Sequence, residues 1–202
     1  MKHNKLRYFF IMALGVIMNE GLYGIARAIH APFWLDTSGT AAAALFLEPT
    51  AGLIVGLINN FYMAISTGDA SNLFYYAASA AVAVIVGVGM RDPSGRICWK
   101  NLLPVMVIIV VVETLIVTPL SLWMDNGMLT TVWEKIIYSK LCSDWGWSKL
   151  WGVFGATLLI KIPDTLASAA ILVGMNALLP QALKNPEDRK PPKQPSSPDA
   201  IQ

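Results

Sequence analysis

The feature that most constrains this chain is a series of long apolar stretches that carry almost no charge. Residues 73–90 contain no charged side chain, and residues 102–124 are interrupted only by Glu113 and two prolines. A helix that crosses a bilayer needs about 20 largely apolar residues, and both stretches approach that length. Residues 6–28 and 150–179 are also long enough, although each contains polar residues. The sequence therefore predicts an all-α integral membrane protein.

Composition excludes several other classes. Hydrophobic residues make up 55% and charged residues 14% of the 202 positions, whereas a soluble domain carries about 25% charged residues. The net charge of +2 is too small for a nucleic-acid-binding surface, so no nucleic-acid partner is expected. Cys98 and Cys142 form no CxxC pair and accompany no histidine cluster, which excludes a zinc site or a disulfide scaffold. No metal or other cofactor is expected.

Residues 36–62 decide how many times the chain crosses the membrane. They form either one long broken helix or two helices that turn at Glu48-Pro49. Proline disfavours a helical conformation for the residue before it, and a glutamate in mid-bilayer is costly. Both effects favour a turn at a membrane surface and a short second span at residues 36–47.

The basic residues favour six spans over five. With six, the lysines and arginines of the N-terminus, of residues 91–100 and of the C-terminal end lie on one side, which the positive-inside rule makes cytoplasmic. We therefore predict a plasma-membrane protein with six transmembrane helices in residues 1–182. Both termini are cytoplasmic, and residues 183–202 form a disordered cytoplasmic tail. A cleaved signal peptide ending near Ala26-Arg27-Ala28 is the alternative for the N-terminus.

A short amphipathic helix is expected in the fifth, external loop. Thr131 with Glu134 matches a capping box, and apolar residues recur there at helical spacing. The apolar positions are Leu129, Val132, Trp133, Ile136 and Ile137. Such a helix either lies in the membrane interface or forms a lid over a pocket.

Polar residues inside the spans are the candidate functional residues, because a polar group in hydrocarbon needs a partner. Lys161 and Asp164 are three residues apart in the last span and can pair directly, and Glu113 lies near the middle of the fifth. Given six spans, the remaining candidates lie toward the outer surface: Glu20, Trp34, Asp36, Asn59, Asn60, Tyr75 and Tyr76. We predict a cup that opens to the outside. The alternative is that Lys161 and Asp164 only stabilise a kink at Pro163.

No enzyme motif accompanies these residues. The chain has no GxSxG, no HExxH and no phosphate-binding glycine loop. We therefore expect no enzyme activity, and intramembrane catalysis by Glu113 and Asp164 is the alternative. Without a nucleotide-binding site, the chain has no energy source of its own.

Two stretches resemble the S components of energy-coupling factor (ECF) transporters, the substrate-capturing membrane subunits of vitamin uptake systems. The stretch that is similar to their second and third spans comprises residues 35–40 (LDTSGT), the alanine-rich run after them, and Pro49, Gly52, Gly56 and Asn60. The sequence Lys161-Ile-Pro-Asp164 is similar to the start of the last span in an uncharacterised branch of the family.

The resemblance implies a six-helix fold with a pocket near the outer surface for a vitamin-like small polar solute. The pocket residues that it implies are Trp34, Asp36, Asn60, Tyr75, Tyr76, Glu113, Lys161 and Asp164. Besides the lipid bilayer, it implies a transmembrane coupling subunit and a pair of ATPases as partners. S components usually dock the coupling subunit through an AxxxA motif on the first span, and the nearest matches here are Ala13 with Ile17 and Gly15 with Asn19.

Two other classes of function fit the same residues. One is a membrane sensor or accessory module without transport activity. The other is a structural membrane protein without a ligand, whose polar pairs serve only helix packing.

The two cysteines test the predicted topology. In the six-span arrangement Cys98 lies on the cytoplasmic side and Cys142 on the outer side. A membrane-impermeant thiol reagent added to intact cells should therefore label the protein at Cys142, and a Cys142→Ser variant should lose the label. Labelling at Cys98 in intact cells would contradict the arrangement.

Overall fold

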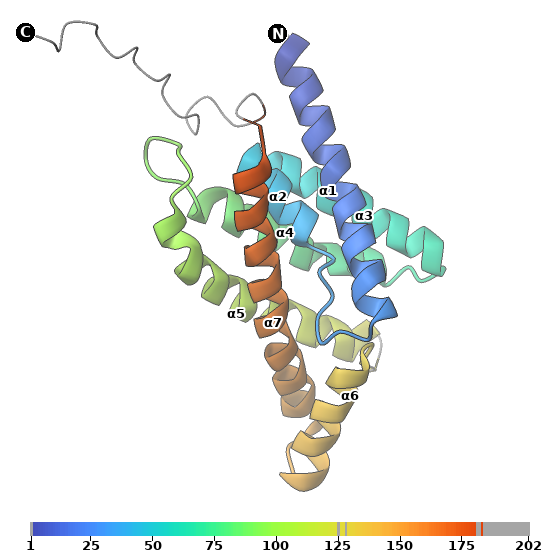
Figure 1. Ribbon diagram of the computed structural model, residues 1–202. Helices are drawn as coiled ribbons and strands as arrows, with labels where there is room; N and C mark the ends of the chain where they lie inside the picture. Colours follow the sequence, from blue (N-terminus) through green and yellow to red (C-terminus); the bar gives the residue numbers. More distant parts are fainter. Residues whose placement is uncertain (1, 125, 128, 181–182, 184–202) are drawn as a thin grey trace, which may run out of the picture.

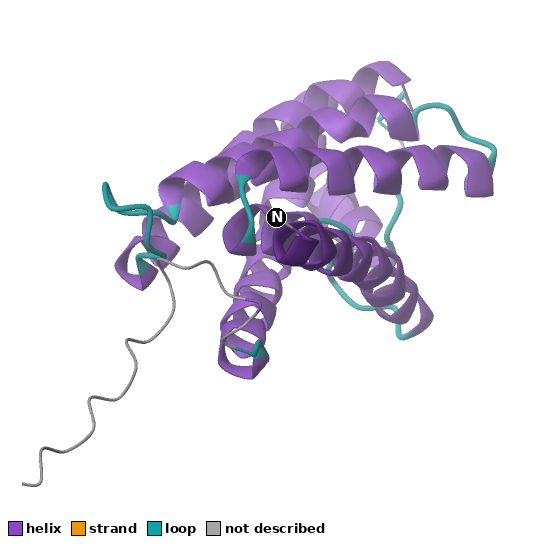
Figure 2. Cartoon of the chain, turned by 90° about the horizontal axis from the view of Figure 1, so that it is seen from above, coloured by secondary structure: helices purple, strands orange, loops and turns teal. Residues whose placement is uncertain are grey.

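The computed structural model describes residues 2–124, 126–127, 129–180 and 183 (Figure 1). Within this part of the chain the regular elements are helical: α1 (Lys2–Ala28), α2 (Ser38–Phe46), α3 (Pro49–Thr67), α4 (Asn72–Gly89), the 3-10 turn η1 (Trp99–Asn101), α5 (Leu102–Met124), α6 (Val132–Ser139), the π-helical turn η2 (Lys140–Asp144) and α7 (Lys149–Leu178). Figure 2 shows these helices from above, joined by loops. The predicted all-α fold is confirmed. Apart from Leu183, the predicted tail at residues 183–202 lies outside the described residues.

Five of the helices are long and apolar enough to cross a membrane: α1 from Lys5 onward, α3, α4, α5 together with η1, and α7. Large apolar side chains cover much of their outer surface, where Phe9 is 73% and Ile65 is 70% exposed. An apolar surface of this extent is unfavourable in water and favourable against lipid. The structure therefore supports a membrane protein with five helices of spanning length.

α2 takes the place of the predicted second span, but it is a short helix inside the bundle. Its nine residues are all buried, and at about 1.5 Å per residue they measure about 14 Å, less than half the thickness of a bilayer core. The turn predicted at Glu48-Pro49 is present, because α3 begins at Pro49. Non-helical chain at residues 29–37 leads into α2. Such backbone occurs in membrane proteins where it is buried in protein or lines a cavity.

Successive helices of the bundle run antiparallel. In the α1–α2 pair, Gly15 packs against Gly39, while Arg7, earlier in α1, donates a hydrogen bond to the carbonyl of Phe46, later in α2. The same reversal recurs between α3 and α4, and Figure 1 shows the N-terminus and the end of α7 at the same end of the molecule.

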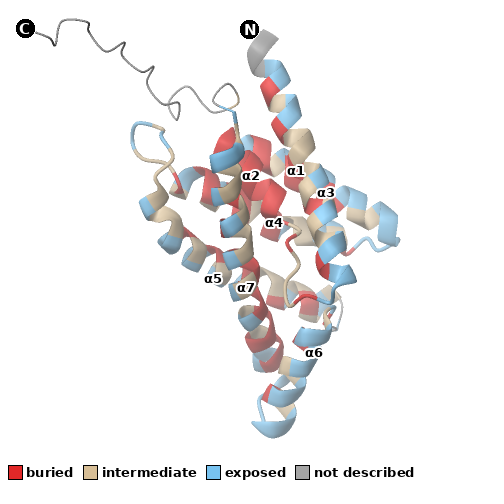
Figure 3. Cartoon of the chain, viewed as in Figure 1, coloured by how far each residue is buried: buried red, intermediate tan, exposed pale blue. Residues whose placement is uncertain are grey.

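Small residues allow the helices around α2 to approach closely. A Cβ atom added at Gly39 would lie 1.8 Å from the carbonyl oxygen of Gly15, and one added at Gly52 would lie 2.7 Å from the Cβ of Ala44. Close backbone approach through small residues is the usual way in which helices pack in membranes. Figure 3 shows α2 as almost entirely buried.

Side chains from neighbouring helices hold both ends of α2. Asn19 Oδ1 accepts hydrogen bonds from the amides of Gly39 and Thr40, at 2.6 and 3.3 Å. At the other end Arg7 and Arg91 donate to the last carbonyl groups of the helix, at 2.9 and 2.6 Å. These bonds satisfy backbone groups that a helix leaves open at its ends, and the arginines complement the negative end of its dipole.

The predicted amphipathic helix is α6, and its capping box is confirmed. The Thr131 hydroxyl accepts from the amide of Glu134 at 3.1 Å, and the Glu134 carboxylate accepts from the amide of Thr131 at 3.0 Å. Glu134 is buried, whereas Val132 and Trp133 are exposed. The helix therefore turns its acidic residue toward the protein and part of its apolar side outward, as expected at a membrane interface.

The close contact of α1 with α2 gives a stability test. Gly39→Ala should lower the free energy of unfolding by about 1–3 kcal/mol, because the new methyl group meets backbone that must shift. Gly21→Ala is the matched control: nothing lies within 4 Å of its added Cβ, and alanine favours a helix interior by about 0.5–1 kcal/mol. Thermal unfolding of the purified protein in detergent measures both. Equal effects of the two substitutions would contradict the packing described here.

Candidate functional site

A buried ion cluster joins α5 to α7 in the middle of the bundle. The Nζ atom of Lys161 lies 2.9 Å from Glu113 Oε1 and 3.4 Å from Asp164 Oδ2. None of the three residues is more than 4% exposed. The sequence predicted the pairing of Lys161 with Asp164, and the structure adds Glu113 from another helix. Because burying charges is costly, such a cluster persists only where each charge has close partners.

Asp164 also holds the non-helical segment that precedes α2. Its Oδ1 atom accepts hydrogen bonds from the amides of Trp34 and Leu35, at 3.0 and 2.8 Å. Leu35 has a φ of 58°, which a residue with a side chain rarely adopts unless its surroundings hold it there. The ring of Trp34 lies 4.7 Å from Lys161 Nζ, within the range of a cation–π interaction. The segment is thus fixed to the ion cluster and covers the ammonium group.

Two cavities adjoin the ion cluster. The larger cavity, with a volume of about 140 Å³, lies on one side of the cluster. Glu113 and Lys161 form part of its wall. Further polar side chains reach it from α1, from the segment before α2, and from α3, α4 and α6: Tyr23, Asp36, Asn59, Asn60, Tyr75 and Glu134. The cavity is therefore built from parts of the chain that are far apart in sequence.

This cavity continues into a wider vestibule of about 940 Å³. The two share lining residues: Tyr23, Trp34, Asn72, Tyr75, Leu129 and Thr130. At the vestibule wall, hydrogen bonds from the Ser71 side chain and amide hold the pKa of the Asp69 carboxyl below its usual range, so Asp69 is ionised. The larger cavity thus has an entrance lined by polar and aromatic side chains.

Two indole groups connect the entrance to the segment before α2. Trp133 of α6 donates a hydrogen bond to the carbonyl of His30 at 2.9 Å. Trp34 donates to the hydroxyl of Thr130, just before α6, at 3.4 Å. Residues 29–37 and the start of α6 are therefore linked at two points.

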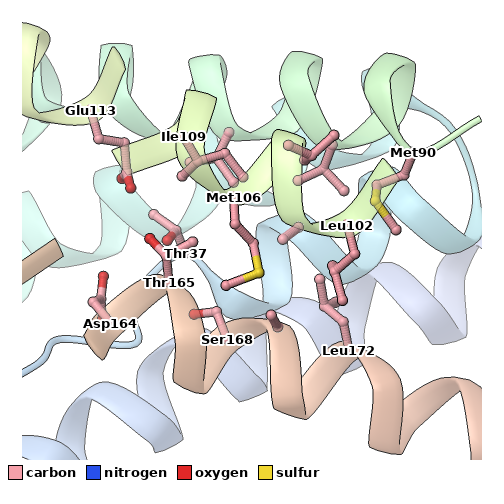
Figure 4. Close-up of a pocket in the computed structure, with 15 residues that line it drawn as sticks. Thr37, Met90, Leu102, Met106, Ile109, Glu113, Asp164, Thr165, Ser168 and Leu172 are labelled. Carbon is pink, nitrogen blue, oxygen red and sulfur yellow. The ribbon is translucent and has the colours of Figure 1, made fainter. Parts of the chain in front are cut away.

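A smaller cavity of about 30 Å³ lies beyond the ion cluster and is mostly apolar. In Figure 4, Glu113 and Asp164 occupy one end of it, and Met90, Leu102 and Leu172 occupy the other. Glu113 lines both cavities. The ion cluster therefore separates a polar space that leads to the vestibule from an apolar space about the size of one water molecule.

Two acceptor atoms in the larger cavity have no hydrogen-bond partner among the described residues. These are Asp36 Oδ1 and Asn59 Oδ1, both of which are buried. Asn59 is only 3% exposed, and its amide nitrogen makes a long contact of 3.5 Å with the carbonyl of Asp36. Nearly all buried polar atoms in proteins have a partner. These two atoms therefore indicate a position for a molecule that donates hydrogen bonds.

The structure brings most of the predicted site residues together. The larger cavity is lined by Trp34, Asp36, Asn60, Tyr75, Glu113 and Lys161, and the smaller one by Asp164. Tyr76 lines none of the three hollows described here. The amide nitrogen of Asn60 is already engaged, because it donates to the Gly56 carbonyl and the Ser79 hydroxyl, both at 2.8 Å. Asn60 therefore braces α3 against α4 as well as lining the cavity.

Two charged or aromatic residues that line the larger cavity, Tyr23 and Glu134, were not selected from the sequence. Tyr23 lies on a polar face of its helix, and that spacing was the signal available for it. Glu134 was interpreted only as part of a helix cap, although it also lines the larger cavity.

Comparison of the chain with protein-family models, with curated proteins and with solved structures gives no match. Function must therefore be argued from the cavity itself. A concave, mostly apolar site with a few converging polar and charged groups is the usual setting of a small-molecule site.

The ion cluster predicts a marked loss of stability when its cation is removed. Lys161→Met should lower the free energy of unfolding by about 3–5 kcal/mol, because it leaves a buried carboxylate without a counter-charge. Adding Glu113→Gln should recover part of that loss. Lys149→Met, which changes an exposed lysine of the same helix, should have an effect within about 0.5 kcal/mol. Thermal unfolding in detergent measures these proteins together with Glu113→Gln alone, and additivity of the Lys161 and Glu113 substitutions would contradict the cluster.

Proposed function

We propose that this protein is the substrate-capturing membrane subunit of an ECF-type uptake transporter and binds a small polar solute in the larger cavity. The observation that carries the proposal is the asymmetry of the interior. A vestibule and a cavity whose walls carry several polar and charged side chains end at a buried ion cluster, and a smaller, more apolar space follows. A channel needs polar lining along its whole length, whereas a binding subunit needs a closed floor.

The arrangement of the helices supports six crossings with both termini on the cytoplasmic side. Successive helices reverse direction, and the N-terminus and the end of α7 lie together in Figure 1. Residues 29–37 and α2 together make the second crossing, with the irregular part beside the cavity. In this orientation the vestibule faces the outside of the plasma membrane, where a solute would arrive.

A transmembrane coupling subunit and an ATPase pair would supply the energy for uptake. Of the two pairs on α1 that come nearest to AxxxA, Gly15 and Asn19 are buried against α2 and are unavailable to a partner. Ile17 is 67% exposed, and Ala13 precedes it by one turn on the same face. We therefore place the coupling contact on the face of α1 that carries Ala13 and Ile17.

Filling the cavity should remove the solute without unfolding the protein. Ala78 is buried and lines the larger cavity, whereas its neighbour Ala77 is exposed on another face of α4. Native mass spectrometry of the purified wild-type protein should detect a bound small molecule. Ala78→Leu should lose at least nine-tenths of it, and Ala77→Leu should retain it.

Two other outcomes would count against the proposed function. A wild-type protein that carries no small molecule and takes none up from a cell extract would contradict solute capture. A solute that is bound but not transported in the presence of coupling subunit and ATPases would favour the sensor or accessory module.

A further inference from the structure

We propose that the captured solute is a small cation, an amine-bearing molecule whose ammonium group is bound by Asp36 and Asn59. The inference rests on the proposed function and adds the chemical class of the solute. Two independent features carry it: the balance of charges around the larger cavity, and the unpaired acceptor atoms in its wall.

Carboxylates outnumber cations around this cavity. Asp36, Glu113 and Glu134 line it, and Asp164 stands behind Lys161. Among the described residues, Lys161 is the one basic side chain in the lining, and its charge interacts with those of Glu113, Asp164 and Asp36. Its ammonium group is already within bonding distance of Glu113 and Asp164, so the charge of Asp36 has no cation of its own. A cationic solute would offset this excess of buried negative charge.

Three other basic side chains lie in the vestibule, outside the cavity, and do not change the balance of charges around the cavity. Arg27, His30 and Lys135 line the vestibule but not the cavity. Asp69 lies at the same level and offsets part of their charge.

The unpaired atoms point to the same chemistry. Asp36 Oδ1 and Asn59 Oδ1 are acceptors, so the missing partner must donate hydrogen bonds. An ammonium group has three donors and no acceptor. A carboxylate or phosphate would place further acceptors against these oxygens and would be repelled.

An anion would be the expected ligand if the start of α2 were open toward the cavity, because helix N-termini attract anions. Thr37, which precedes α2, does line the cavity. The amides of Gly39 and Thr40 are already bonded to Asn19, however, and the amide of Ser38 reaches the carbonyl of Leu35 at 3.4 Å. The donors that would hold an anion here are therefore in use.

Size and aromatic lining narrow the class further. The cavity volume of about 140 Å³ is close to the roughly 150 Å³ of an engineered protein cavity that holds benzene. The solute should therefore contain about six to ten non-hydrogen atoms. Tyr23, Trp34 and Tyr75 line the space, and aromatic faces stabilise cations by about 0.5–2 kcal/mol.

The test compares probes of similar size and shape whose polar group is cationic, neutral or anionic. Benzylamine, benzyl alcohol and benzoate have nearly the same size and shape, and cyclohexylamine with cyclohexanol and cyclohexanecarboxylate gives a second set. We expect the amines to raise the unfolding temperature of the detergent-purified full chain in proportion to the logarithm of their concentration, with the neutral and anionic probes giving little or no shift. If neither amine exceeds its neutral counterpart, or if an anion gives the larger shift, the assignment to a cation is overturned.

Two variants locate the binding group. Asp36→Asn keeps the shape of the side chain and removes its charge, and Asn59→Leu removes an acceptor. Each should weaken amine binding at least tenfold. Asp144→Asn, which changes an exposed carboxylate in η2, should leave amine binding unchanged. Full amine affinity in Asp36→Asn would overturn the proposal.

The unfolding temperature of the unliganded Asp36→Asn protein distinguishes a ligand-binding role of this carboxylate from a structural role. Removing one of the crowded carboxylates should leave its unfolding temperature unchanged or raise it, whereas a structural role for the charge requires a decrease. This result also separates the inference from the proposed function. A neutral or anionic molecule found in the purified wild-type protein would reject the cation and leave solute capture in place.

Discussion

A buried lysine shared by carboxylates from two helices is the interaction on which the rest of this structure depends. Lys161 forms ion pairs with Glu113 of α5 and Asp164 of α7, so these helices are joined at the level of the ion cluster between the two cavities. Asp164 keeps one oxygen for the backbone of Trp34 and Leu35. One cluster therefore sets the packing of two long helices, the path of the segment before α2 and the floor of the larger cavity.

α2 shows how a bundle can enclose a polar space without a sixth long helix. Its run of small residues lets α1 and α3 approach closely, and Asn19, Arg7 and Arg91 satisfy the backbone groups at its two ends. The short helix is buried along its whole length. The irregular chain before it lines the larger cavity through Trp34, Asp36 and Thr37.

Features governed by local rules could be predicted from the sequence. The helical fold follows from apolar stretches, the turn at Pro49 from proline geometry, and the Lys161–Asp164 pair from their spacing. Features governed by the packing of distant segments could not. Tyr75 and Tyr76 are neighbours that point about 100° apart on α4, and the contacts of α4 with α3 decide that only Tyr75 faces the cavity. The role of Asn19 likewise depends on the register between α1 and α2.

The paired indole contacts at the entrance have a mechanical consequence. Trp133 donates a hydrogen bond to the carbonyl of His30, and Trp34 donates one to the hydroxyl of Thr130. These two bonds join the start of α6 to residues 29–37. A displacement of either segment must therefore break these hydrogen bonds or move the other segment with it. Because the ring of Trp34 also lies 4.7 Å from Lys161 Nζ, any displacement of residues 29–37 would change both the entrance of the cavity and the covering of the ammonium group.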